Sequence, residues 1–148
     1  MKKITLLFVV ALIAAIAVWW PTTSAQERDE AGVRQAIEYY FQGHATGNGE
    51  HHKKAFHPEA KLFWIREGQF TQRTSAEYIA GSSGKPAADE AQRKRSITMI
   101  DITGNAAVAK VVLDYPQVRF TDYMSLLKID GEWKIVNKTF VAEQKPKS

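Results

Sequence analysis

FTDYMSLLKIDGEWKIVNK, residues 120–138, is the stretch that decides the fold, because it holds two strand-like segments around a tight turn. The turn is Asp130-Gly131, a dipeptide typical of β-hairpins. The pairing of the two strands depends on the length of this turn. A two-residue turn places Lys128 opposite Trp133, whereas a three-residue turn with Gly131 in a bulge places Leu127 opposite Trp133.

We expect the bulged register, because it pairs Leu127 with Trp133 and also sets the opposite charges of Asp122 and Lys138 across from each other. The inner face of the hairpin would then carry Tyr123, Ser125, Leu127, Trp133, Ile135 and Asn137. The outer face would carry Phe120, Met124, Leu126, Val136 and Phe140.

The chain before this hairpin begins with helical patterns and continues with strand-like segments. Apolar residues recur at helical spacing over 29–45, Asn48 can cap a short helix that ends at Phe56, and Thr74 or Ser75 can cap a third through Ile79. Strands are predicted over 60–66, 69–73, 96–103, 106–114, 119–129 and 132–141. This order predicts an α+β fold, with helices packed on one face of a curved, mainly antiparallel sheet.

The N-terminal segment has the features of a secretory signal. Lys2 and Lys3 precede an apolar run over 4–20, and Thr23-Ser24-Ala25 offers a small-residue cleavage site. We therefore predict a signal peptide over 1–25, cleaved after Ala25, and one domain over 26–148 in a secreted or periplasmic protein. The alternative is an uncleaved membrane anchor, for which the run of about 17 residues is barely long enough.

The composition argues against disulfide stabilisation and against nucleic-acid binding. The 148-residue chain has no cysteine, so packing alone must stabilise the exported domain. Without Lys2 and Lys3, 18 basic residues face 16 acidic ones, which gives no reason to expect nucleic-acid binding. No membrane contact is expected unless the signal is retained.

The histidines do not form a metal-binding pattern. His51 and His52 are adjacent and point about 100 degrees apart on a helix, and His57 lies beyond the helix end. The pair at i and i+4 of a zinc-binding helix is missing, so we expect no metal. His44 lies on the inward stripe of the first helix and is the best acid–base candidate.

Three stretches carry a resemblance to a known family: 33–47 with 55–60, then 103–109, then 120–138. They resemble the nuclear transport factor 2-like superfamily, whose ketosteroid-isomerase-like and SnoaL-like members are cystatin-like cones of helices over a curved sheet. Within it the chain looks most like the putative lumazine-binding branch. The resemblance implies a cone with a central pocket, but such folds host both enzymes and binding proteins.

The resemblance also argues against isomerase chemistry. The isomerase-like relatives place a carboxylate base after the second helix, where this chain has Phe63 and Trp64. Tyr40 falls where those relatives place a tyrosine that donates to an oxyanion. A donor without a base cannot transfer a proton, so we lean away from an enzyme.

Aromatic residues are concentrated in the elements that would build the cone, which favours a small-ligand pocket. We therefore expect an exported protein that binds a small, partly apolar molecule without a cofactor. The candidate pocket residues are Tyr40, His44, Phe56, Trp64, Tyr123, Ser125 and Asn137. One alternative is a dehydratase- or isomerase-like enzyme built on His44 with Tyr40 or Tyr123. Another is a structural or accessory dimer whose cone is filled by its own aromatic side chains.

The predicted outer face of the hairpin is apolar, and a soluble monomer rarely exposes a large contiguous apolar patch. We therefore expect a homodimer through this face, formed by Phe120, Met124, Leu126, Val136 and Phe140.

Overall fold

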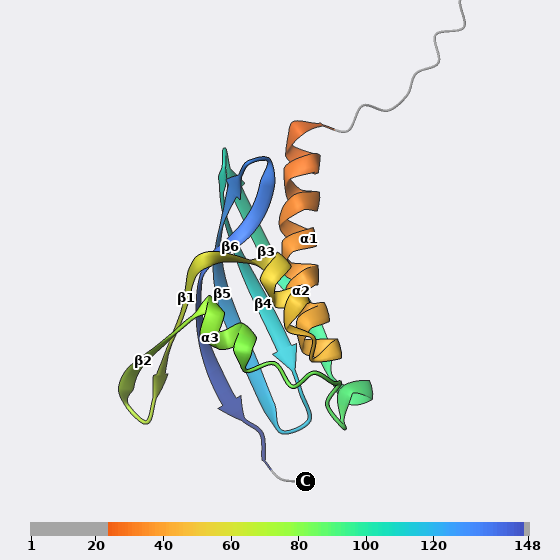
Figure 1. The fold of residues 1–148 in the computed structure, drawn as a ribbon, viewed down its shortest axis with the longest axis vertical. Coiled ribbons are helices and arrows are strands. Elements are labelled where there is room, and N and C mark those ends of the chain that lie inside the picture. The colour runs from red at the N-terminus through yellow and green to blue at the C-terminus, as the bar shows by residue number, and fades with distance from the viewer. Residues whose placement is uncertain (1–23, 147–148) are drawn as a thin grey trace, which may run out of the picture.

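The computed structural model describes residues 24–146 and confirms the α+β prediction. Helices cover one face of a curved six-stranded sheet (Figure 1). The helices are α1 (Ala25–Thr46), α2 (Gly49–Ala55) and α3 (Ser75–Ala80), with a short 3₁₀ turn at Glu90–Gln92. The strands are β1 (Phe56–Arg66), β2 (Gln69–Thr74), β3 (Lys94–Thr103), β4 (Ala106–Asp114), β5 (Val118–Ile129) and β6 (Glu132–Gln144).

Helix α1 begins four residues before the predicted start because Ser24 caps it. The Ser24 hydroxyl accepts from the Glu27 amide at 3.1 Å, and the Glu27 carboxylate accepts from the Ser24 amide at 2.7 Å. This reciprocal pair satisfies two amide groups that have no partner within the helix. At the other end Gly47 adopts a left-handed conformation, with φ of 68°, and stops the helix.

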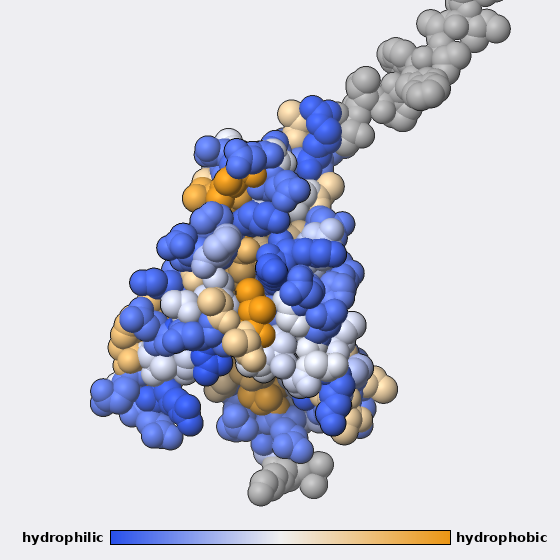
Figure 2. Space-filling view, in the orientation of Figure 1, coloured by the Kyte–Doolittle hydropathy of each residue, from blue (hydrophilic) through white to orange (hydrophobic). Residues whose placement is uncertain are grey.

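The sheet has the strand order β2-β1-β6-β5-β4-β3. Strands β1 and β6 are parallel, and all other neighbours are antiparallel. Helix α1 lies along the sheet, and α3 lies beside the β1–β2 hairpin, which projects from the body (Figure 1). Three buried residues of α1, namely Val33, Ile37 and Tyr40, belong to the same core as Met124 and Ile135 of the sheet. The face of the molecule that carries the helices is mostly hydrophilic, with small apolar patches (Figure 2).

The predicted register of the last hairpin is wrong. Lys128 lies opposite Trp133, as a two-residue turn requires. Asp130 and Gly131 have φ angles of 51° and 85°, so both adopt the positive φ that a tight hairpin turn of this kind needs. A bulge does occur, but it lies farther from the turn, where Leu126 pairs with Ile135 and Ser125 with Asn137.

In the observed register, the residues of β5 lie on the opposite sides of the sheet from those predicted. Met124 and Leu126 are 1% exposed and belong to the core, whereas Tyr123 is 50% exposed on the outer side. The predicted outer patch is therefore wrong for four residues: Met124 and Leu126 are buried, and Phe120 and Phe140 also lie on the inner side of the sheet. Val136, at the bulge, lines a shallow outer hollow together with Val108. The outer face exposes a different set of large apolar side chains, Met99, Val108, Tyr123, Leu127 and Val141.

The predicted signal peptide lies outside the described residues except for Ser24 and Ala25. Within residues 24–146 none of the helices combines the length and the apolar character needed to cross a bilayer.

Candidate functional site

A cavity of about 200 Å³ lies between α1, α3 and the concave side of the sheet. Its wall is mainly aromatic and aliphatic, with a few polar groups at one side. It is lined by Tyr40, His44, Leu62, Trp64, Arg73, Tyr78, Leu113, Phe120, Lys138 and Phe140. A mostly apolar hollow with a small number of convergent polar groups is typical of a small-ligand site.

At the polar side of the cavity Lys138 and Tyr40 line the wall, and Asp122 is buried behind them, so that the three form a hydrogen-bonded triad. The Lys138 ammonium donates to the Tyr40 hydroxyl oxygen at 2.8 Å and to Asp122 Oδ2 at 3.2 Å. The Tyr40 hydroxyl in turn donates to the same Asp122 oxygen at 2.7 Å. The side chains of Lys138 and Asp122 are 5% and 0% exposed. Two opposite charges buried this completely need each other, because either one alone would lose its hydration without compensation.

Burial also shifts the pKa values of Tyr40 and Lys138. Loss of hydration raises the pKa of Tyr40 well above its usual value, and the neighbouring Asp122 charge raises it further. The same loss of hydration lowers the pKa of Lys138, although the Asp122 carboxylate opposes that shift. Asp122 Oδ1 is buried and has no hydrogen-bond partner among the described residues, so the carboxylate keeps free accepting capacity.

Three aromatic rings surround the Lys138 ammonium. Its nitrogen lies 4.4 Å from the ring centre of Phe140, 5.0 Å from that of Tyr40 and 5.7 Å from that of Tyr78. Ring faces attract cations, most strongly where water is excluded. The site is therefore built to hold a positive charge at the tip of Lys138.

A second polar pair, His44 and Tyr78, forms the wall towards the loop at 81–93. The Tyr78 hydroxyl lies 2.9 Å from His44 Nε2. Burial lowers the pKa of His44 well below its usual value, and the positive charge of Lys138 adds to the effect. His44 is thus neutral at pH 7 and can exchange a hydrogen bond with Tyr78. Both residues also line a second hollow, of about 220 Å³, beneath that loop.

His52 lies behind this pair and is 5% exposed. Burial, followed by the charge of Lys138, lowers the pKa of His52 to about 4. The unfolded chain takes up this proton near pH 6.5, so between these values the unfolded state binds more protons and acid favours unfolding. We expect His52 to account for about 2–3 kcal/mol of stability that is present at pH 7 and lost as the pH falls towards 4.

The variant His52→Leu should remove this part of the acid sensitivity, whereas His57→Gln, beyond the end of α2, should keep it. Urea unfolding at pH 7 and at about pH 4.5 measures the difference, and His44 accounts for some of the remainder. An unchanged acid sensitivity in His52→Leu would contradict the assignment.

The structure brings together only part of the predicted pocket. Tyr40, His44 and Trp64 line the cavity. Phe56 is buried behind it, with its ring 5.9 Å from that of Tyr40.

Tyr123, Ser125 and Asn137 do not join the predicted pocket residues in the cavity. Ser125 pairs with Asn137, and Tyr123 and Ser125 are exposed on the outer side of the sheet. The expectation that Tyr123 and Asn137 face the cavity is therefore wrong, because it rested on the wrong register.

Sequence reasoning missed the two charged residues of the site. Asp122 and Lys138 were expected on the outer face, directly opposite each other, yet both lie inside, and Lys138 pairs with Met124 in the ladder. A carboxylate therefore lies directly behind the cavity wall, bonded to Tyr40 and Lys138, and it comes from β5 rather than from the segment after α2. The alternation of Asp122 with Met124 and Leu126 is the signal that could have found it, since the three residues share one face of a strand.

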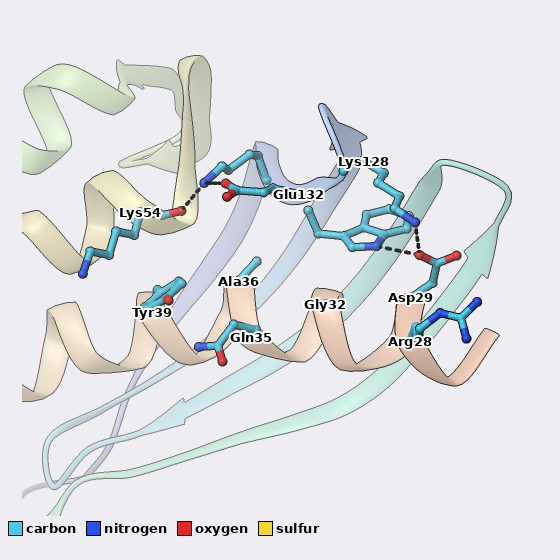
Figure 3. A pocket seen from close by; sticks show the side chains of 12 residues that line it. Arg28, Asp29, Gly32, Gln35, Ala36, Tyr39, Lys54, Lys128 and Glu132 are labelled. Carbon is cyan, nitrogen blue, oxygen red and sulfur yellow. Dashed lines mark hydrogen bonds and ion pairs between the residues drawn. The ribbon is translucent and has the colours of Figure 1, made fainter. Parts of the chain in front are cut away.

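The hollow between the first half of α1 and the β5–β6 hairpin is larger, about 600 Å³, but four of its charged side chains are already paired with one another (Figure 3). Asp29 accepts from the Lys128 ammonium at 2.6 Å and from the Trp133 indole at 3.3 Å. Lys134 lies 2.8 Å from a Glu132 oxygen and donates to the Lys54 carbonyl oxygen at 3.1 Å. Exposed, mutually paired side chains of this kind suit a hydrated surface cleft, so we place the candidate site in the smaller, more apolar cavity.

Among residues 24–146 no group of three or more histidine and acidic side chains is arranged to hold a metal ion. The polar groups that line the cavity are one amine, two phenols and an imidazole, with the Arg73 guanidinium at its edge. The Asp122 carboxylate is buried behind the amine and one of the phenols.

Solved structures resemble this fold closely. A nuclear transport factor 2-like protein of unknown function from Shewanella baltica has a TM-score of 0.73 at 23% identity, with 84% of this chain and 100% of that chain covered. One from Silicibacter pomeroyi has a TM-score of 0.71 at 21% identity, covering 81% and 100%. One from Methylobacillus flagellatus has a TM-score of 0.67 at 29% identity, covering 82% and 95%.

Two comparisons of the sequence relate the chain to a protein with a named activity and to a family. A protein named aldolase FrzH, from a Cladobotryum species, is 26% identical over 103 residues, which cover 68% of this chain and 81% of that protein. The model of the family described as putative lumazine-binding matches residues 28–141, which include most of the helices and the sheet and every residue that lines the cavity. The chain therefore belongs to the putative lumazine-binding family and has the nuclear transport factor 2-like cone fold.

Proposed function

We propose that this chain is an exported protein that binds a small, partly apolar molecule in the cavity lined by Tyr40, Trp64 and Lys138. The observation that carries the proposal is the buried Lys138–Asp122 pair at the side of a mainly apolar hollow. Such a pair costs hydration energy and is poor at raising stability, so a role in recognition explains it better. Membership of the putative lumazine-binding family supports a small-molecule ligand.

The ligand is small and carries an oxygen acceptor. The cavity of about 200 Å³ is below the range of roughly 300–1,000 Å³ that holds drug-sized ligands. Aromatic walls favour a flat, partly apolar body, and the ammonium of Lys138 favours a carbonyl or carboxylate oxygen. The hollow also counts against a purely structural dimer with a filled cone.

Blocking the cavity tests this proposal. Mass spectrometry of material that co-purifies with the protein identifies a ligand, and a thermal-shift screen of small carbonyl compounds finds others. Phe120→Trp should abolish binding, because Phe120 lines the cavity. Gln35→Trp adds the same side chain to the cleft of Figure 3 and should leave binding intact. Equal loss of binding in both variants would contradict the proposed site, and so would unchanged binding in both.

A second candidate is an enzyme that acts on a carbonyl compound in the same cavity. The specific observation is that a carboxylate, an amine and a phenol lie within 3.2 Å of one another, so a proton acceptor and donors are in place. The similarity to a protein named an aldolase supports this candidate. Isomerase-, dehydratase- and aldolase-type reactions all remove a proton beside a carbonyl group. Deuterium uptake from heavy water at that carbon, lost in Asp122→Asn, would distinguish an enzyme from a binding protein.

Export also belongs to the proposal. We predict that protein recovered from the cell envelope or the medium lacks residues 1–25, because Thr23-Ser24-Ala25 offers a cleavage site. Cleavage after Ala25 also removes the Ser24 cap, so the first turn of α1 should fray. Intact-mass measurement decides the matter, and a species that retains Met1 would instead support an anchor.

The homodimer is now proposed through the side chains that the outer face exposes, with Tyr123, 50% exposed on β5, near the middle of the sheet. Tyr123→Glu should shift the protein to monomer by placing two like charges in an apolar seam. Gln35→Glu, an exposed position on α1, should not. Analytical ultracentrifugation at micromolar concentration measures both. A parent protein that is already monomeric would contradict the dimer.

A further inference from the structure

Lys138 is a primary amine held in the wall of a cavity that excludes most water. Its side chain is 5% exposed and lines the cavity directly. An ammonium group has three N–H donors, and the Tyr40 hydroxyl and Asp122 accept two of them. One donor direction is left for another partner. Lys128 and Lys134 line the other cleft instead, where carboxylates and a carbonyl oxygen hold them near the surface.

We propose that Lys138 condenses with the carbonyl carbon of a small aldehyde or ketone in this cavity and forms a Schiff base. The inference rests on the proposed function, since it needs the ligand to enter the same cavity, and it adds a covalent bond that simple binding does not require.

The step balances with the groups present. The Lys138 ammonium gives one proton to Asp122, and the freed amine attacks the carbonyl carbon, so a C–N bond forms and the carbonyl oxygen becomes an alkoxide. A proton moves from the new nitrogen to that oxygen, with the Tyr40 hydroxyl, 2.8 Å from the amine, as relay. Asp122 then returns its proton, the C–O bond breaks and water leaves. An ammonium and a carbonyl thus become an iminium and water, without oxidation or reduction.

The surroundings of Lys138 suit this product. The iminium carries the same single positive charge as the ammonium, so the Asp122 carboxylate has a cationic partner both before and after the reaction. The rings of Phe140 and Tyr40, at 4.4 Å and 5.0 Å, face the cation in both states. Burial lowers the pKa of Lys138 and so eases the loss of the first proton. Lys128 and Lys134 also have carboxylate partners, but they lie near the surface and outside this apolar cavity.

Reductive trapping tests the inference. The purified protein is incubated with benzaldehyde, a partly apolar carbonyl compound of suitable size, and cyanoborohydride, and its peptides are mapped by mass spectrometry. We expect a benzyl group on Lys138 at least about tenfold sooner than on Lys128 or Lys134, because the cavity holds the aldehyde next to the Lys138 amine, where Asp122 and Tyr40 can move its protons. Lys128 and Lys134 serve as internal controls within the parent protein, so this comparison does not depend on whether a variant folds.

Lys138→Arg is the matched variant, because arginine keeps the positive charge beside Asp122 but cannot form a Schiff base. It should lose the label at position 138 and leave the labelling of surface lysines unchanged. One outcome would overturn the covalent step and keep the binding function. In it, the surface lysines are labelled but Lys138 is not, while benzaldehyde still raises the melting temperature of the parent protein but not that of Phe120→Trp. No stabilisation by any carbonyl compound and no label at Lys138 would overturn both.

Discussion

Asp122→Leu is expected to lower the free energy of unfolding by about 3–5 kcal/mol, a large share of the stability of a domain this size. The variant leaves the Lys138 ammonium, 5% exposed, without a counter-ion and the Tyr40 hydroxyl without its acceptor. A buried charge that has lost its partner keeps the full cost of dehydration. Urea unfolding at pH 7, followed by circular dichroism, measures the change.

Two controls separate charge burial from loss of shape. The double variant Asp122→Leu with Lys138→Met removes both charges and should recover much of the lost stability, since apolar replacements of a buried pair are often neutral. Lys53→Met breaks the exposed pair with Glu50, whose atoms lie 3.8 Å apart, and should change stability by less than about 0.5 kcal/mol. A double variant as unstable as Asp122→Leu would contradict the argument.

The secondary structure could be predicted from the sequence because its signals are local. Thr74 with Glu77 forms the capping box that starts α3, and Asn48 caps α2, as expected. The turns at Gly104 and Asp130-Gly131 also lie where expected. Each of these depends on residues within a few positions, so no knowledge of the tertiary packing is needed.

The site could be predicted only in part, because it depends on the register of one hairpin. Trp133 and Ile135 face inwards, but the bulge at Val136 reverses the alternation of β6, so Lys138 and Phe140 also face inwards. Without that extra residue Lys138 would lie on the outer face. The expected charge pair between Asp122 and Lys138 does form, but on the inner side of the sheet rather than on the predicted outer side. A bulge inside a strand leaves little trace in composition, and it becomes visible only in the pairing of β6 with its neighbours β5 and β1.

Residues on α1 were easier to predict, because helical periodicity does not depend on a partner. Tyr40 and His44 lie one turn apart on the stripe that faces the sheet, and both line the cavity as the spacing indicated. The charged partners of Tyr40 come from β5 and β6, and His44 pairs with Tyr78 of α3. The helix half of the site was therefore readable from sequence, and the sheet half was not.

Gly47 is the position where α1 ends and the loop at 81–93 rests on the helices. Its φ of 68° is one that side chains with a Cβ atom adopt at a cost. Its carbonyl oxygen accepts from the Gly84 amide at 2.8 Å, which ties the loop to the helix end. A Cβ atom here would overlap the Lys85 carbonyl oxygen and the Ser83 hydroxyl. The loop lines the hollow next to His44 and Tyr78, so its position bears on the wall of the cavity.

Gly47→Ala is therefore expected to lower the free energy of unfolding by about 2–5 kcal/mol, the sum of about 1–2 for the left-handed conformation and about 1–3 for the overlap. Gly104→Ala is the matched control, because Gly104 has a φ of 59° but nothing within 4 Å of the added atom. It should cost only the conformational part, about 1–2 kcal/mol. Urea unfolding compares the two variants, and hydrogen exchange at the Gly84 amide, which donates to Gly47, should accelerate in Gly47→Ala alone. Equal losses of stability would mean that the loop yields freely, and that its contact with the helix end does not hold the wall around His44 and Tyr78 in place.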